Sequence, residues 1–210
     1  MAEKKITIDS GEPKIEVLLE SGNGERGVVI THPHPLYGGD MYNNVVESIT
    51  RSYIEMGYST LRFNFRGVGQ SEGLYDDGIG EQDDIRNAVT YLCETGCKHI
   101  DLAGYSFGAW VSARGIKSYT QVERLVMVSP PVSFMDFSSL TYNPKIEFVI
   151  VGSDDEFADV KETEQALDTW NPKAQLKIID GADHFYQGKC NDLKLLLKQF
   201  LKNHNKTEIH

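Results

Sequence analysis

Two serines of the chain lie between glycines in the pattern G-x-S-x-G: Ser71, within residues 69–73, and Ser106, within residues 104–108. This pattern is typical of a nucleophile where the serine occupies a sharp turn between a strand and a helix, because the turn exposes the hydroxyl group. The glycines relieve crowding at such a turn. The elements around the two serines therefore distinguish them.

Ser106 has the required flanks. Residues His99–Ala103 predict a strand, and residues 107–118 show the three- and four-residue apolar spacing of a helix. Ser71 lies in a glycine-rich stretch that no helix follows directly. A helix N-cap would also explain Ser106, but a cap does not require a glycine two residues away on each side. We therefore expect Ser106 to be the nucleophile.

A serine hydroxyl group needs a base at neutral pH, and histidine is the side chain whose pKa lies near that range. Of six histidines, His184 comes after a predicted strand, Gln175–Ile179, and before the last predicted helix. His99 begins a strand, and His204 and His210 lie in the C-terminal helix and tail. His32 and His34 precede the serine, against the expected chain order of Ser, acid and His. His184 is the predicted base.

An acidic residue must hold the histidine tautomer and stabilise the charged ring. Residues Glu147–Val151 predict a strand, and Gly152-Ser153-Asp154-Asp155 follows it directly. We predict Asp155 as the acid. Asp154 is the alternative because the register of the loop is open by one residue, and Asp183, next to His184, is the poorer candidate on geometry.

Strands and helices alternate along the chain. Apolar or alternating runs ended by turn residues predict strands at Lys14–Leu19, Gly27–Thr31, Thr60–Phe65, His99–Ala103, Arg124–Val128, Glu147–Val151 and Gln175–Ile179. Helical spacing predicts helices at Asn44–Met56, Glu81–Glu94, Phe107–Ser118, Val160–Trp170 and Asp192–Asn203. The fold class is therefore α/β, with a mostly parallel, doubly wound sheet and helices on both faces.

Two further expectations follow from this order of elements. The first two strands have no helix between them, so we expect them to form an antiparallel hairpin at one edge of the sheet. In open sheets of this class, ligands bind outside the carboxyl ends of the strands. The three candidate residues all follow a predicted strand, so they are expected to meet at that edge.

Composition limits the other possibilities. A chain of 210 residues fits a single domain, 1–210, and its net charge of −10 and pI of about 5.0 argue against nucleic acid or anionic lipid as partners. The first residues lack the apolar core of a signal peptide, and no segment approaches the roughly 18 apolar residues of a membrane helix. We expect a cytoplasmic protein with no membrane partner.

The cysteines and the acidic residues do not predict a metal site. Cys93 and Cys97 are one helical turn apart and, with Cys190, make an odd number, which favours packed thiols over disulfides. Zinc would need more ligands near the first pair. The acidic residues between Asp76 and Asp84 are interrupted by glycines and predict a solvated loop that leads into a helix. We expect neither a metal nor an organic cofactor.

Four segments together resemble the α/β-hydrolase superfamily, and within it the small lidless hydrolases related to dienelactone hydrolase and to prolyl-oligopeptidase catalytic domains. The most specific segment, residues 32–41 with the sequence HPHPLYGGDM, is similar to the HPHP signature of a bacterial group. The other three are residues 104–108, 152–155 and 181–184. Dienelactone hydrolases have cysteine at the position of Ser106, so that activity is not expected.

The resemblance implies an oxyanion hole made of two backbone N–H groups. One belongs to Phe107, directly after the serine. The other belongs to the loop after the second predicted strand, at His34 or at Leu36, since Pro35 has no N–H group. The side chains of His32 and His34 are expected to brace this loop rather than to transfer protons.

The chain has little sequence between Pro131 and Lys145, where larger relatives insert a lid, so the expected cleft is open. Apolar residues of this segment could form an acyl-side wall or ordinary core: Val132, Phe134, Met135, Phe137, Leu140 and Tyr142.

These features predict a serine hydrolase that cleaves an ester or related small acyl substrate through an acyl-enzyme, most simply a carboxylesterase. A thioesterase, a small-peptide hydrolase and a noncatalytic binding protein that reuses the fold are the alternatives.

Overall fold

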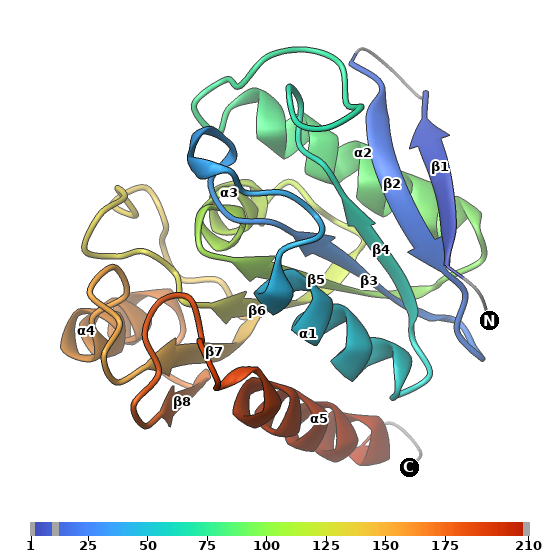
Figure 1. Ribbon diagram of the computed structural model, residues 1–210. Coiled ribbons are helices and arrows are strands. Elements are labelled where there is room, and N and C mark those ends of the chain that lie inside the picture. The colour runs from blue at the N-terminus through green and yellow to red at the C-terminus, as the bar shows by residue number, and fades with distance from the viewer. Residues whose placement is uncertain (1–2, 10–12, 208–210) are drawn as a thin grey trace.

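The computed structural model describes residues 3–9 and 13–207, and its strands form one eight-stranded sheet in the order β1-β2-β4-β3-β5-β6-β7-β8 (Figure 1). Six strands make up the centre and one end of the sheet: β3 Arg26–Thr31, β4 Ser59–Phe63, β5 His99–Tyr105, β6 Val122–Val128, β7 Ile146–Gly152 and β8 Gln175–Ile179. They run parallel to one another. The predicted α/β fold with a mostly parallel sheet is confirmed.

Helices cover both faces of this sheet (Figure 1). One face packs against α1 Asn44–Ile54 and α5 Cys190–Thr207, and the other against α2 Gly80–Glu94, α3 Phe107–Gly115 and α4 Val160–Trp170. Neighbouring residues of a strand point to opposite faces. In β3, Val28 and Ile30 accordingly pack with the first helix group and Val29 with the second, so the central strands are apolar on both sides.

The first strands are arranged differently from the prediction. The hairpin between residues 14–19 and 27–31 is wrong, because β2 Ile15–Glu20 pairs antiparallel with β4 and with β1 Lys4–Ile8, a strand that was not predicted. Strand β4 lies between β2 and β3. Two hydrogen bonds fix the link between β2 and β3 to the residues at the start of β4: Gly22 N–H donates to Ser59 Oγ at 3.0 Å, and Asn23 N–H donates to the Gly57 carbonyl at 3.0 Å.

The two ends of the sheet are edge strands of similar character. Strand β1 exposes Lys4 and Lys5 at one end, and β8 exposes Lys177 and Ile178 at the other. Short, largely exposed strands carry little apolar periodicity. Strand β8 nevertheless has its predicted bounds, so exposure alone does not account for the absence of β1 from the prediction.

The register of the sheet brings distant loops together. Thr31 pairs with Gly104, Tyr105 with Val128, and Gly152 with Ile179, so the carboxyl ends of β3, β5, β6, β7 and β8 lie along one edge. The residues that follow these strands therefore converge there, as the sequence predicted.

The acidic stretch from Asp76 to Asp84, which runs into the first turns of α2, is more ordered than a solvated loop. Glu81 is buried and accepts the N–H groups of Asp76 at 2.8 Å and Gly78 at 2.9 Å, and buried Asp84 forms an ion pair with Arg66 at 2.8 Å. These carboxylates satisfy backbone and guanidinium donors of the chain itself. Across the described residues there is no group of three or more His, Cys, Asp or Glu side chains that could hold a metal ion.

The three cysteines are free thiols, and Cys97 and Cys93 pack at the core, as predicted. Burial raises the pKa of the Cys93 thiol. In the described part of the chain, every helix is too short or too polar to span a bilayer.

Candidate active site

Ser106 stands at the corner between β5 and α3 with φ 54° and ψ −121°. A positive φ is strained for a residue with a side chain and is typical of the turn that exposes a nucleophilic serine. The Ser106 N–H group donates to the Val128 carbonyl at 3.0 Å, which ties the corner to β6. The strand-to-helix position predicted for Ser106 is confirmed.

The two glycines around Ser106 permit close packing. A Cβ at Gly104 would lie 2.6 Å from the backbone of Ala109, and a Cβ at Gly108 would lie 2.5 Å from Thr31 Oγ1 and 2.7 Å from the His32 carbonyl oxygen. Any side chain at position 108 would push α3 away from the end of β3. The glycines thus hold the serine turn against the loop that follows β3.

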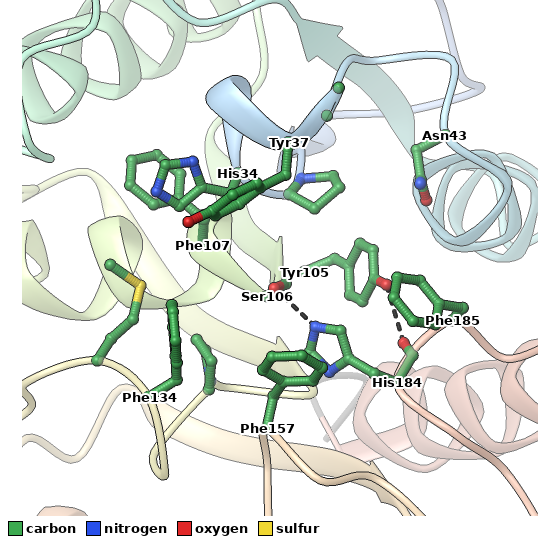
Figure 2. Close-up of a pocket in the computed structure, with 15 residues that line it drawn as sticks. His34, Tyr37, Asn43, Tyr105, Ser106, Phe107, Phe134, Phe157, His184 and Phe185 are labelled. Atoms are coloured by element: carbon green, nitrogen blue, oxygen red, sulfur yellow. Dashed lines mark hydrogen bonds between the residues drawn. The ribbon is translucent and has the colours of Figure 1, made fainter.

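The structure brings the three predicted side chains together in one hydrogen-bonded chain. Ser106 Oγ lies 2.9 Å from His184 Nε2, and His184 Nδ1 lies 2.9 and 3.0 Å from the two carboxylate oxygens of Asp155. Figure 2 shows the first of these bonds at the centre of the pocket. All three residues are buried. In this geometry the ring donates from Nδ1 and can accept the serine proton at Nε2.

The geometry also separates Asp155 from the other carboxylates. Besides His184, Asp155 Oδ1 accepts the N–H groups of Phe157 at 3.0 Å and Ala158 at 2.9 Å. Asp154 is exposed and accepts the Ser153 hydroxyl at 2.8 Å, while Asp183 accepts backbone N–H groups of its own loop. Only Asp155, of these three, contacts the His184 ring.

The carboxylate of Asp155 is kept ionised. Burial favours its protonated form, but hydrogen bonds from His184, Ser129 and Ala158 outweigh burial and hold the pKa of Asp155 below its usual range. An ionised carboxylate can fix the tautomer of His184 and stabilise the ring when it is charged.

Ser129 and Tyr186 support this carboxylate and were not singled out from the sequence. Ser129 is buried, has φ 46°, hydrogen-bonds to Asp155, and lies 2.8 Å from the hydroxyl group of buried Tyr186. Ser129 directly follows β6, so the rule that functional residues follow strands could have found it. Tyr186 lies in the segment between β8 and α5, and its role depends on a contact with the distant segment after β6, which no local pattern predicts.

The loop after β3 faces the start of α3. His34 and Phe107 both line the pocket and their rings are 4.7 Å apart, whereas Leu36 is 67% exposed and donates its N–H group to His34 Nδ1 at 3.3 Å. Within the described chain, the backbone N–H groups of His34 and Phe107 have no acceptor. Of the two predicted loop positions, His34 is therefore the one at the pocket.

The His32 side chain braces this loop from behind. His32 is fully buried, its Nε2 accepts the Phe65 N–H group at 3.0 Å, and its Nδ1 lies 2.7 Å from the Pro33 carbonyl oxygen. Burial lowers the pKa of His32 to about 4, so the ring is neutral at neutral pH. This contact joins the end of β3 to the residues after β4.

A cavity of about 400 Å³ opens beside Ser106 and is walled mainly by apolar side chains (Figure 2). Phe134, Met135 and Phe157 form part of the wall. Of the two alternatives for this apolar segment, the wall applies to Phe134 and Met135, and core packing applies to Val132, Phe137 and Leu140. Tyr142 does neither and is exposed. Among the described residues, no Lys, Arg, Asp or Glu lines this cavity.

No family model matches the chain. An uncharacterized protein of Rickettsia prowazekii is 34% identical over 183 residues, which cover 82% of this chain and 77% of that protein. The structure of an α/β serine hydrolase homologue from Coxiella burnetii is similar at a TM-score of 0.88 and 33% identity, over 96% of this chain and 98% of that one.

A Xanthomonas campestris protein described as an α/β serine hydrolase without a lid matches at a TM-score of 0.87 and 30% identity, over 97% of this chain and 95% of that one. The chain belongs to the lidless α/β serine hydrolases. In this hydrolase, the link between β6 and β7 contains no helix or strand, and its residues Phe134 and Met135 reach the cavity directly.

Proposed function

We propose that the hydrolase is a carboxylesterase in which Ser106, His184 and Asp155 are the catalytic residues. The observation that carries the proposal is the unbroken hydrogen-bonded chain from Ser106 Oγ through His184 to Asp155, at the floor of an apolar cavity. Such a chain activates a hydroxyl group that is a weak nucleophile by itself.

The proposed reaction has two halves. Ser106 Oγ attacks the ester carbonyl carbon while its proton passes to His184 Nε2, and the tetrahedral intermediate then expels the alcohol, which takes the proton from His184. Water attacks the resulting acyl-enzyme, gives its proton to His184, and the acid leaves as Ser106 Oγ recovers that proton. Asp155 stays ionised and orients the ring throughout.

The backbone N–H groups of Phe107 and His34 are proposed to bind the oxyanion. Phe107 is the first residue of α3, where a helix leaves its N–H groups without internal partners. Donors of this kind are worth about 2.7–4 kcal/mol each at the transition state in measured systems. Leu36 is not part of this proposal because its N–H group is bonded to His34 Nδ1.

An ester fits the cavity better than a charged acyl compound. The cavity is apolar, and an ion there would lose its hydration without finding a counter-charge among the lining residues. The open link between β6 and β7 leaves the mouth accessible to short and medium acyl chains.

The test combines labelling with a substrate panel. A fluorophosphonate should label the wild type at Ser106 with one-to-one stoichiometry and should not label Ser106→Ala. In a panel of p-nitrophenyl esters of graded acyl length, an acyl-CoA and an aminoacyl amide, the esters should give the highest kcat/KM. Higher kcat/KM on the acyl-CoA or the amide would replace the carboxylesterase assignment, and failure of the labelling would refute the nucleophile.

A further inference from the structure

Asn43 places an amide at the wall of the cavity. It is the N-cap of α1, where its Oδ1 accepts the Val45 N–H group at 2.9 Å, and it lines the cavity (Figure 2). Because the helix N–H group needs an acceptor, this bond fixes the oxygen of the amide toward the helix and leaves Nδ2 as the outward group. Within the described residues, Asn43 Nδ2 has no acceptor.

Asn43 lies on the His184 side of the nucleophile. Its neighbour Asn44 donates from Nδ2 to the Phe185 carbonyl at 3.3 Å, so the start of α1 is fixed against the residue that follows His184. In Figure 2, Ser106 lies between this side, with Asn43 and Phe185, and the opposite side, with Phe134. Since His184 gives its proton to the departing oxygen, the alcohol part of the ester leaves on this side.

The other polar side chains that line the cavity are already used or lie at its mouth. The Tyr105 hydroxyl donates to the His184 carbonyl at 2.8 Å, and His34 is bonded through Nδ1 to Leu36 and through Nε2, at 3.3 Å, to the Tyr75 hydroxyl. Tyr37 is 77% exposed. Asn43 Nδ2 is thus a donor with unused capacity in a wall that is otherwise apolar on this side.

We propose that Asn43 is a specificity-determining residue, which donates a hydrogen bond from Nδ2 to an uncharged oxygen in the alcohol part of the substrate. The substrate class is then neutral esters of short alcohols that carry an ether or hydroxyl oxygen. This inference rests on the proposed ester hydrolysis. A site with such a donor disfavours an analogue that lacks the acceptor, because the donor loses water without gaining a partner.

The experiment compares two esters that have the same number of heavy atoms, 2-methoxyethyl butanoate and butyl butanoate. The wild type should hydrolyse the methoxyethyl ester with a kcat/KM about fivefold higher, as expected for one neutral hydrogen bond. In Asn43→Ser, which keeps a capping oxygen but removes Nδ2, the ratio of kcat/KM between the esters should fall to about one. Asn43→Asp puts an acceptor in place of the donor and should bring the ratio below one.

Tyr42→Ser is the matched control, because Tyr42 is the exposed neighbour of Asn43 and does not line the cavity; it should keep the fivefold ratio. If Asn43→Ser keeps the wild-type ratio of kcat/KM between the esters, the proposal is overturned. Equal losses of kcat/KM on both esters would be one such case and would mean a purely structural role. If the wild type hydrolyses both esters rapidly and the ratio of their kcat/KM values is near one, the role of Asn43 is refuted while ester hydrolysis stands. If the wild type hydrolyses neither ester and Ser106 is not labelled, ester hydrolysis itself is refuted.

Discussion

Ser71 and Ser106 have the same flanking pattern and the same exposed fraction, 8%, but different surroundings. Ser71 Oγ accepts the Glu16 N–H group at 2.9 Å and donates to the Asn64 carbonyl at 2.6 Å, so it joins β2 to the end of β4. Ser106 Oγ instead faces His184 Nε2. One hydroxyl is satisfied by backbone groups, and the other is available for chemistry.

The comparison shows which feature around the G-x-S-x-G pattern distinguishes a candidate nucleophile from a structural serine. Both serines lie beyond the carboxyl end of a strand, so position at that edge does not separate them. The difference is the helix that starts directly after Ser106: the serine at this corner has a positive φ, which Ser71 does not. Both glycines allow close packing, but against different groups. Gly69, with φ 58° in a loop turn, lies against the side chains of Asn64 and Glu16, while Gly108 lies against Thr31 and the His32 carbonyl at the end of β3.

The sharpest test of this contrast is the pair Ser106→Ala and Ser71→Ala. Loss of the nucleophile should lower kcat on a p-nitrophenyl ester by about 10⁴- to 10⁶-fold, as in other serine hydrolases. Loss of the Ser71 hydroxyl leaves buried backbone groups unpaired and should lower the free energy of unfolding by about 1–3 kcal/mol, while kcat stays within a few-fold. Steady-state kinetics and urea denaturation measure both, and equal losses of kcat would contradict the contrast.

The next largest effect is expected at the acid. Asp155→Asn should lower kcat by about 10⁴-fold, the loss known for the equivalent change in a serine protease, because the amide favours the wrong histidine tautomer. Asp154→Asn should have far less effect, since Asp154 contacts Ser153 at the surface. Circular dichroism establishes that both variants fold. A crippled Asp154→Asn beside an active Asp155→Asn would move the assignment by one residue.

A smaller effect is expected from the glycines. In Gly108→Ala the new Cβ meets the His32 carbonyl and must shift the oxyanion loop, so kcat/KM should fall by about 100-fold, as for misplacement of catalytic groups by about 1 Å. Gly69→Ala instead imposes a positive φ on alanine and places a Cβ against Asn64 Nδ2 and 2.6 Å from Glu16 Oε2, so it should lower the free energy of unfolding by at least the roughly 1–2 kcal/mol of the positive φ. If Gly69→Ala reduces kcat/KM as much as Gly108→Ala, the two loops are not functionally distinct.

The last test acts on stability at acid pH rather than on turnover, and it uses His32. This residue joins the loop after β3, beside Ser106, to Phe65 at the start of the segment that contains Ser71. Its pKa is about 4 in the folded chain and near 6.5 in the unfolded one, so between these pH values the unfolded chain binds the extra proton. Stability from this residue is therefore complete above pH 6.5 and is lost as pH falls toward 4, by about 3 kcal/mol.

In His32→Gln this component should be absent, and the difference between wild type and variant in free energy of unfolding, followed by urea denaturation from pH 7 to 4, measures it. Parallel pH profiles would mean that His32 is not kept neutral by burial.

Much of the fold and the candidate site could be predicted because the signals were local. Buried strands are nearly continuous apolar runs, and α4, with its acidic N-cap and amphipathic spacing, begins and ends at the predicted residues Val160 and Trp170. The strand and helix on either side of Ser106, and the order of Asp155 and His184 after it, can also be predicted from the sequence alone.

The rest depends on contacts between distant segments. The partner of β2 is β4 rather than β3 because residues 59–63 enter the sheet between them, and no local pattern encodes that choice. Asn43 reads as an ordinary helix cap, and its second role emerges only where α1 meets the segment after His184. The resemblance placed the loop donor at His34, with Leu36 as the alternative for a longer loop, and only the bond from the Leu36 N–H group back to the His34 ring separates the two.

The lysines at both ends of the sheet have a consequence for behaviour at high concentration. An edge strand presents unpaired backbone groups to any other strand in solution, and edge-to-edge pairing of this kind is a route to aggregates. Pairing of two copies through β1 would crowd Lys4 and Lys5 of one against those of the other, and pairing through β8 would do the same with Lys177. The lysine charges on β1 and β8 thus oppose the incorporation of either edge into a larger sheet.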